Sequence, residues 1–391
     1  MKTQSKNHPD SQGLRTWIEI DTKAMKHNYD LLRGLLSPKT KMMAVVKSNA
    51  YGHSLIDFSQ EMERLGADWF GVDSILEGQA LRKAGIKAPI LVLGYTLPSK
   101  IETAAEENIS ITVSTFETLE EITELTKGGK LSDFSKNLSI HIKVDTGMHR
   151  QGFMLNQIEE AVSKLKSLPE NIKIEGLFTH FAAAKNPAFP ARTLVQIEQF
   201  EVWIKAFKQA GFSPIIHAAA SGGAIVFPQS HYDMVRLGIV IYGLWPSAQV
   251  RGFAQKDLPL KPVMTWKAVV GEVKIVPKGE SVGYDLTETL KRDSKLAIVP
   301  VGYWHGLPRL LSSVSDVLIG GKRARMVGRV SMDMITLDVT DIPGVKVGDV
   351  VTILGQDGDD RISPKEIADQ SETSEYEIIT RTNPLIKKIF V

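Results

Sequence analysis

The chain has 391 residues, which is too many for one typical domain and predicts two. Its 47 Lys and Arg nearly balance its 45 Asp and Glu, so there is no charge footprint for nucleic acid or an anionic membrane. The absence of cysteine excludes disulfides, cysteine zinc sites and thiol nucleophiles. Because we find neither a signal-peptide run nor a membrane-length apolar stretch, we expect a cytoplasmic protein with small-molecule partners.

From Met42 to Gly238, short apolar runs alternate with amphipathic segments of helix length. The runs are residues 42–47, 68–72, 89–94, 109–113, 139–146, 173–180, 214–219 and 234–238. The clearest helical segment is 195–211, where apolar residues recur at helical spacing before a capping glycine: Ile197, Phe200, Trp203, Ile204, Phe207 and then Gly211. Continuous apolar runs with helical crossovers indicate parallel strands covered on both faces. Eight of them predict an α/β fold with a (β/α)8 barrel.

After Gly243 the chain changes character. Short β-branched runs with glycines follow closely on one another, and few helical stretches remain, which predicts a separate, mainly β domain. The expected division is an N-terminal extension at 1–15, the barrel at 16–250 and the C-terminal β domain at 251–391. Residues 17–20 read as an additional strand whose partner the sequence does not identify.

The C-terminal ends of the strands are where a barrel enzyme places its site. Those ends carry cationic and hydrogen-bonding groups: Lys47, Lys143 with Arg150, His180, His217 with Ser221, and Arg236. The ends of strands two to four carry nothing comparably reactive. Such a rim suits an anionic ligand with a phosphate and a carboxylate. No metal site is expected.

Lys47 ends an apolar strand in the segment AVVKSNAYGHS. A partly desolvated amine there can act as a nucleophile. The alternative is a lysine whose ammonium simply reaches solvent from a strand end. Tyr51, four residues on, either binds a phosphate oxygen or packs in the loop.

The segment AVVKSNAYGH resembles the cofactor-lysine segment of alanine racemases. Further segments follow in that family's order: KVDTGMHRQGF (143–153), EGLFTHFA (175–182), HAAAS (217–221), VRLGIVIYG (235–243), SVGYD (281–285), PVGYWHG (300–306), VGRVSMD (327–333) and EYE (375–377). The resemblance runs from Thr16 to about Tyr376. It implies pyridoxal 5′-phosphate (PLP) carried on Lys47.

The resemblance also implies the reaction, which is interconversion of L- and D-alanine to supply D-alanine for peptidoglycan. Two bases on opposite faces of the substrate exchange its α-proton, and they match Lys47 and Tyr284. His180 matches the residue beside that tyrosine, whose ordinary pKa near 10 calls for such a neighbour. Without the resemblance, Tyr284 would read as an ordinary strand aromatic.

The remaining roles follow from the same resemblance. Arg236 matches the arginine that faces the cofactor's pyridine nitrogen. The phosphate site matches Tyr51, Ser221, Gly238, Ile239 and Tyr376. The substrate carboxylate matches Arg150 and Met332, and the substrate entrance matches Tyr303. Three positions would support these residues: Lys143, Asp333 and His217. Lys143 matches a lysine that is carbamylated in some members; without the resemblance it would be a plain strand lysine. Without the resemblance, Asp333 would be a turn residue.

In the family, the β domain of one subunit closes the barrel mouth of its partner, so the resemblance implies a homodimer with shared active sites. Three departures from the usual pattern, Asp285, Trp304 and His305, leave substrate size and the entrance open. The main alternative is therefore a broad-specificity, serine or lysine racemase with the same mechanism. A PLP decarboxylase is disfavoured by the absence of cysteine, and a non-catalytic PLP-binding protein by the presence of a β domain with Tyr284.

Overall fold

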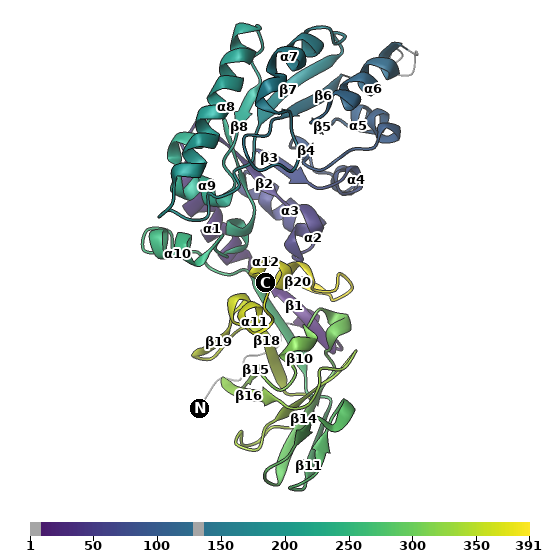
Figure 1. The fold of residues 1–391 in the computed structure, drawn as a ribbon. Coiled ribbons are helices and arrows are strands. Elements are labelled where there is room, and N and C mark those ends of the chain that lie inside the picture. Colours follow the sequence, from purple (N-terminus) through teal and green to yellow (C-terminus); the bar gives the residue numbers. More distant parts are fainter. Residues whose placement is uncertain (1–8, 128–136) are drawn as a thin grey trace. The chain divides into compact units, whose positions relative to one another are not determined.

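The computed structural model describes residues 9–127 and 137–391. The chain divides into two compact units. The barrel unit comprises Met25–Ala50 and Leu55–Lys261. The β unit comprises the residues up to Ala24, the short segment Tyr51–Ser54, and Pro262–Val391 (Figure 1).

The barrel unit contains a parallel eight-stranded sheet in the order β8-β7-β6-β5-β4-β3-β2-β9. Its strands are β2 (Lys41–Val45), β3 (Trp69–Val72), β4 (Ile90–Val92), β5 (Ile109–Val113), β6 (Leu138–Lys143), β7 (Ile172–Phe178), β8 (Ile215–His217) and β9 (Met234–Leu237). Hydrogen bonds from Asp233 N to Ile216 O and from Arg236 N to Ala219 O join the two ends of the sheet. The predicted (β/α)8 barrel is therefore confirmed, with one strand in each of the eight runs.

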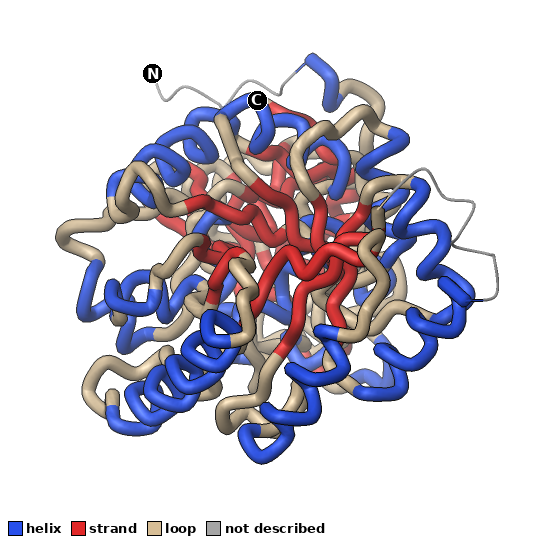
Figure 2. Tube along the Cα trace, turned by 90° about the horizontal axis from the view of Figure 1, so that it is seen from above, coloured by secondary structure: helices blue, strands red, loops and turns tan. Residues whose placement is uncertain are grey.

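Helices cover the outside of this barrel, as Figure 2 shows for the strands at the centre and the surrounding helices. They are α1 (Thr22–Gly34), α3 (Leu55–Leu65), α4 (Ile75–Lys83), α5 (Ile101–Glu106), α6 (Phe116–Lys127), α7 (Ile158–Lys166), α8 (Ala191–Gln209), α9 (Ser221–Val226) and α10 (Ala248–Ala254). In α8 the predicted apolar stripe buries Phe200, Trp203 and Phe207. Gly211 follows with φ of 88°, as a capping glycine requires.

The β unit is built on a mostly antiparallel ten-stranded sheet in the order β11-β14-β17-β16-β15-β18-β10-β1-β20, with β19 paired to β18. The strands are β1 (Thr16–Ile20), β10 (Met264–Val269), β11 (Glu272–Val276), β14 (Ser294–Val299), β15 (Asp316–Ile319), β16 (Lys322–Met326), β17 (Ile335–Asp338), β18 (Val350–Asp357), β19 (Asp360–Ile362) and β20 (Lys388–Phe390). A separate hairpin pairs β12 (Ser281–Val282) with β13 (Glu288–Thr289). Two helices, α11 (Pro364–Gln370) and α12 (Glu375–Thr380), complete the unit.

The N-terminal strand β1 is where the compact units differ from the expected domain ranges. It pairs antiparallel with β10 and parallel with β20, and Trp17, Ile18 and Ile20 are fully buried. Burial of these side chains explains why the segment belongs with residues far away in the sequence. The second difference is at the junction, because α10 and the residues up to Lys261 belong to the barrel unit.

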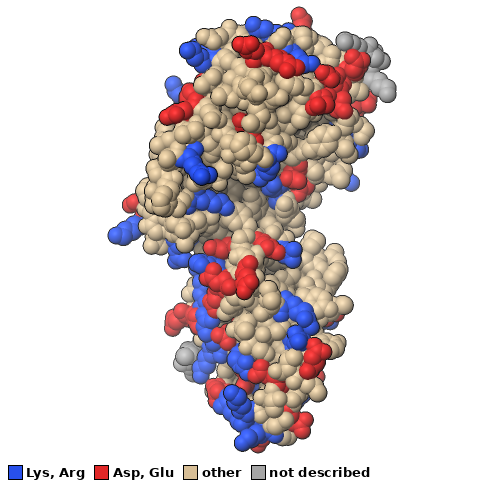
Figure 3. Space-filling model, in the orientation of Figure 1, with Lys and Arg blue, Asp and Glu red and all other residues tan. Residues whose placement is uncertain are grey.

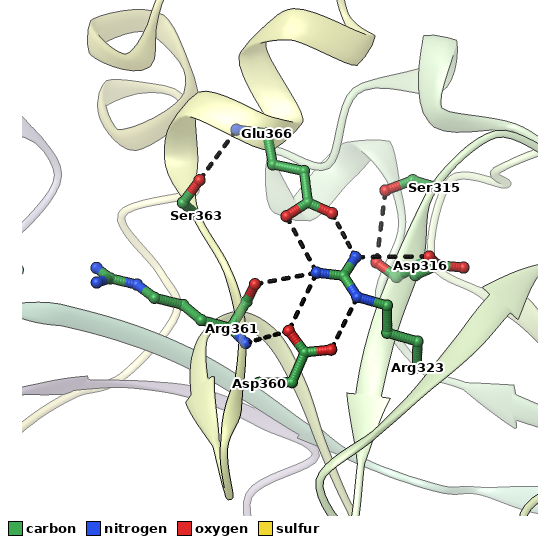
Figure 4. Close-up of polar contacts among 7 residues, drawn as sticks. All are labelled: Ser315, Asp316, Arg323, Asp360, Arg361, Ser363 and Glu366. Atoms are coloured by element: carbon green, nitrogen blue, oxygen red, sulfur yellow. Dashed lines mark hydrogen bonds and ion pairs between the residues drawn. The ribbon is translucent and has the colours of Figure 1, made fainter. Parts of the chain in front are cut away.

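Arg323 joins four elements of the β unit through a cluster of ionic and polar contacts (Figure 4). From β16, its guanidinium lies 2.9 Å from Asp360, 2.5 Å from Glu366 and 3.5 Å from Asp316, and it donates to the carbonyl of Arg361. The hydrogen bonds to the two nearest carboxylates raise the pKa of Arg323. The cluster therefore connects the β15–β16 hairpin to β19 and to the first turn of α11.

The surface carries charges of both signs. On the face drawn in Figure 3, Lys and Arg are interspersed with Asp and Glu. Among residues 9–127 and 137–391, no helix has both the length and the apolar character that crossing a membrane requires.

Candidate active site

Lys47 is followed by one turn of left-handed helix, α2 (Lys47–Tyr51). Ser48, Asn49, Ala50 and Tyr51 have φ between 50° and 56°, a conformation that costs a residue with a side chain roughly 1–2 kcal/mol each. None of them is glycine, so the sequence gives no sign of this turn. Strain of this kind is found at functional sites when the surroundings hold it in place.

Glu77 of α4 holds the turn. Its carboxylate accepts hydrogen bonds from Ser48 N (2.7 Å), Asn49 N (3.3 Å) and Asp73 N (2.8 Å). The side chain of Asn49 in turn accepts from Leu55 N at 2.9 Å. The first two backbone N–H groups after Lys47 are thereby satisfied by one carboxylate.

The amine of Lys47 lies 3.0 Å from Asp73 Oδ1. Asp73 directly follows β3, so one of the strand ends from which nothing comparably reactive was expected does bring a charged partner to Lys47. The sequence could have revealed it, because a carboxylate directly after a buried parallel strand faces the same rim as the other strand ends.

Four cationic side chains converge on His180, which follows β7. Burial, followed by the positive charges of Arg236, Arg150, Lys143 and Lys47, lowers the pKa of His180 to about 3. Lys143, Arg150, Gln151 and His180 line one small pocket together with the loop after β6. Three of the rim residues predicted from the sequence, Lys143, Arg150 and His180, therefore share one pocket, and an anion bound there would relieve the repulsion between the two cations.

Lys143 is buried, at 6% exposure, at the end of β6. It donates to Gln151 Oε1 at 2.8 Å, and its ammonium lies 5.5 Å from the centre of the Phe178 ring. Burial, followed by the charges of Arg150, Arg236 and Lys47, lowers its pKa to about 8. Gln151 was not singled out in the sequence, since a neutral amide in a loop carries no distinctive signal.

Arg236 of β9 is buried and surrounded by acceptors. One terminal nitrogen donates to Thr179 O (2.7 Å) and Ala218 O (2.9 Å), and lies 3.3 Å from His180 Nδ1. The other lies 3.0 Å from His217 Nδ1. Burial lowers the pKa of Arg236 to about 9. These contacts fix the plane of the guanidinium.

The predicted phosphate residues fall into two groups. In the barrel unit, Ser221 begins α9, and its Oγ accepts a hydrogen bond from Gly238 N at 3.0 Å; Ile239 follows directly at the start of a short 3-10 turn. In the β unit, the rings of Tyr51 and Tyr376 lie 6.2 Å apart. Burial raises the pKa of Tyr376, so its hydroxyl stays protonated and able to donate.

Tyr284 lies in the β unit on a tight turn and is 68% exposed. Asp285 and Leu286 beside it have positive φ, and Asp285 pairs with Arg329 at 2.8 Å. The departure at Asp285 therefore has a structural consequence, because this ion pair connects the turn of Tyr284 to the loop that leads to Met332.

Tyr303 and Met332 lie on neighbouring loops of the β unit, since Tyr303 N donates to Ser331 O and Trp304 N to Met332 O. Trp304 is 56% exposed and Asp333 is exposed. His305, by contrast, is buried and accepts a hydrogen bond from Gly302 N through Nδ1. Of the three departures from the family pattern, His305 therefore supports the loop from inside, while Trp304 and Asp285 face outward.

The family model "Alanine racemase, N-terminal domain" matches residues 20–246, and "Alanine racemase, C-terminal domain" matches residues 263–390. An alanine racemase of Methanococcus maripaludis is 40% identical over 377 residues, covering 96% of this chain and 98% of its own. One from Leptospira interrogans is 37% identical over 383 residues, covering 96% of each.

This chain belongs to the alanine racemase family. Solved structures agree: alanine racemase from Clostridium difficile matches with a TM-score of 0.89 and 31% identity, covering 97% of this chain and 96% of that one. The Bacillus anthracis enzyme with bound L-Ala-P matches with a TM-score of 0.88 and 34% identity, covering 96% and 95%. The family is one of PLP-dependent isomerases, and the order of barrel and β domain is the one that the sequence predicted.

Proposed function

We propose that this chain binds PLP through Lys47 and interconverts L- and D-alanine, supplying D-alanine for peptidoglycan. The observation that carries the proposal is the pocket at the barrel rim that Lys143, Arg150 and His180 line together, with Arg236 3.3 Å from His180 Nδ1. Such a donor set fits a cofactor with a phosphate and a phenolic oxygen, together with a substrate carboxylate. When bound, PLP withdraws electrons from the substrate Cα, so that its α-proton becomes acidic.

Two bases move this proton. Lys47 serves one face of the substrate, and Tyr284 serves the other. Asp73 provides Lys47 with a carboxylate partner at 3.0 Å, which holds the amine at the rim. The neutral ring of His180 accepts hydrogen bonds without adding a further positive charge to the site.

The other residues of the site hold the cofactor and orient the substrate. Arg236, whose donors are directed by its carbonyl partners, discourages protonation of the pyridine nitrogen and so limits side reactions. The phosphate is held by Ser221, the backbone at Gly238 and Ile239, and the hydroxyls of Tyr51 and Tyr376. Arg150 and the backbone of Met332 bind the substrate carboxylate, and Tyr303 lies at the substrate entrance. Lys143 and Asp333 support their neighbours, and His217 supports Arg236.

A labelling experiment tests the covalent part of the proposal. Borohydride reduction of the PLP-loaded protein should remove its visible absorbance and place a pyridoxyl group on Lys47 in a tryptic map. Lys47→Ala should show neither label nor racemisation. A label on another lysine would overturn the assignment. Initial rates on a panel of L-amino acids show whether the enzyme prefers alanine, serine or lysine or accepts many substrates. Growth of a D-alanine-requiring strain that expresses this chain tests the cell-wall role.

We also propose a homodimer with shared sites. Six large apolar side chains of the β unit are between 44% and 68% exposed: Tyr284, Leu286, Tyr303, Trp304, Met332 and Met334. Hydrogen bonds from Tyr303 N to Ser331 O and from Trp304 N to Met332 O bring two of the loops together, and exposed apolar side chains that gather in this way indicate an interaction surface. Three of its members are proposed substrate-side residues, so a second copy of this chain is the partner that would use them.

Subunit mixing tests this arrangement. Lys47→Ala and Tyr284→Phe homodimers should both be nearly inactive. After exchange, half of the dimers are mixed, and each has one intact site, so activity should rise to about a quarter of wild type. Mass spectrometry of differently tagged subunits verifies the exchange. No recovery after verified exchange would show that each site is built within one chain.

A further inference from the structure

A row of polar groups leads from Arg236 through two buried histidines to the partly buried Glu175. Arg236 lies 3.0 Å from His217 Nδ1, and His217 Nε2 lies 3.0 Å from His141 Nδ1. His141 Nε2 faces Glu175 Oε2 at 3.5 Å, which is longer than a normal hydrogen bond. Both histidines are completely buried, and they come from β8 and β6, while Glu175 comes from β7.

The chemistry of the two end groups, Arg236 and Glu175, determines the direction in which the hydrogen bonds of the row are donated. Arg236 can only donate, so His217 Nδ1 must accept, and its proton must be on Nε2. That proton is donated to Nδ1 of His141, which places the proton of His141 on its own Nε2. A bare nitrogen lone pair there would face the carboxylate of Glu175, whereas an N–H is attracted to it. Every proton position in the row therefore follows from its two charged ends.

The fold makes specific room for this row. The pairing of β6 with β7 shifts register between Ile140 and His141, which places the imidazole opposite Gly176. A Cβ on Gly176 would lie 2.0 Å from His141 Nδ1, so the neighbouring strand can carry no side chain there. The ring of His217 stacks on that of Phe178, with centres 4.7 Å apart and planes 9° apart.

Glu175 is itself held as an anion. Ser110 Oγ donates to one of its oxygens at 2.6 Å, and Lys173 Nζ donates to the other at 2.8 Å. Burial opposes its ionisation, but the contacts with His141, Lys173 and Ser110 outweigh burial and bring its pKa to about 2. Burial lowers the pKa of both His141 and His217, which agrees with two neutral rings between one cation and one anion.

We propose that His141 and Glu175 are positioning residues for Arg236, acting through the tautomer of His217. If His217 carried its proton on Nδ1, an N–H would face the guanidinium, and Arg236 would lose one of its acceptors. Glu175 has no contact with Arg236 in this row, yet its charge selects the tautomer that keeps the guanidinium in place. The proposal rests on the proposed function for its catalytic consequence, because Arg236 is the residue assigned to the pyridine nitrogen.

The tautomers are tested first, on the PLP-free protein. Long-range ¹⁵N–¹H NMR of histidine-labelled chain should show both rings as neutral Nε2–H forms, with signals assigned from their loss in His141→Leu and His217→Gln. An Nδ1–H form or an imidazolium at either position would overturn the proposal. Because no cofactor is present, this result does not depend on whether the chain is a racemase.

The consequence for Arg236 is tested on the PLP-loaded enzyme. The quantity measured is the ratio of pyruvate, the product of the transamination side reaction, to D-alanine, the product of racemisation. His141→Leu removes the acceptor and the donor together, and the ratio should rise roughly five- to tenfold, as for the loss of one buried hydrogen bond. In His141→Gln the amide can still accept and donate in the same direction, so the ratio should stay within about twofold of wild type. Thr112→Val is the matched control, because it removes a buried hydrogen bond of the barrel, to Val92 O, that lies outside the row, and the ratio should stay within about twofold of wild type.

Glu175→Gln tests the same proposal if His141→Leu does not fold. It keeps the shape of the side chain but removes the charge that selects the tautomer, so the ratio of pyruvate to D-alanine should again rise. An unchanged ratio in a folded His141→Leu or Glu175→Gln enzyme would contradict the proposal. Wild-type enzyme without racemase activity would instead refute the proposed function and leave the NMR result standing.

Discussion

Replacing Lys143 with methionine should stabilise the cofactor-free protein, although it removes a residue of the proposed site. The amine is buried among other cations, and its pKa falls from 10.5 to about 8. At about 1.4 kcal/mol for each pKa unit, the buried charge costs about 3 kcal/mol at neutral pH. Loss of the hydrogen bond to Gln151 offsets about 1 kcal/mol, so we expect a net gain of about 2 kcal/mol.

The sign of the pH dependence follows from the lowered pKa. Below pH 8 both the folded and the unfolded chain carry the proton, so the folded state bears the whole cost. Between pH 8 and 10.5 the folded chain has lost the proton while the unfolded chain keeps it, and the cost disappears progressively. The gain from Lys143→Met should therefore be full at pH 7 and mostly lost at pH 10.

Urea unfolding of the cofactor-free protein at these two pH values measures the effect. CO2-free buffer is needed, because a carbamylated Lys143 would be an anion. Lys26→Met is the control, since Lys26 is 60% exposed and pairs with Asp30 on the surface of α1, and it should change stability by less than about 0.5 kcal/mol. A gain of the same size at pH 7 and pH 10, or a loss at pH 7, would refute the electrostatic reasoning.

Four further predictions concern single elements. Gly176→Ala should destabilise the chain by about 3 kcal/mol through the clash with His141, and adding His141→Ala should recover most of the loss in a double-mutant cycle of urea midpoints. Glu77→Ala should slow covalent capture of PLP at least tenfold in stopped-flow absorbance, because the left-handed turn loses its hydrogen-bond acceptor. An unchanged rate would mean that the turn is stable without Glu77. Tyr284→Phe should lower turnover by about 10²–10⁴-fold while the cofactor spectrum persists, and near-full activity would exclude this residue as a base. Arg323→Met should cost about 1–2 kcal/mol, because its carboxylate cluster is half-buried, and an unchanged melting temperature would show that the cluster contributes nothing.

The barrel could be predicted from the sequence because its strands are continuous apolar runs, and a run buried on both faces leaves little choice of structure. The partners of β1 could not be predicted, since both lie hundreds of residues away and no local pattern encodes the pairing. Among the site residues, those at strand ends were found by their place at the rim. Asp73 was missed although it is also at a strand end, and His141 and Glu175 lie within strands, where only the register of β6 against β7 brings them together.

The left-handed turn after Lys47 also makes the position of the amine depend on the folding of its neighbours. In an unfolded or partly folded chain, Ser48, Asn49 and Ala50 favour right-handed or extended backbone, since nothing there offsets the strain. The native presentation of Lys47 therefore exists only after α4 has docked and supplied the carboxylate of Glu77. Under the proposed function, Lys47 should capture PLP only after α4 has docked, and the rate of capture should report how far this part of the barrel has folded.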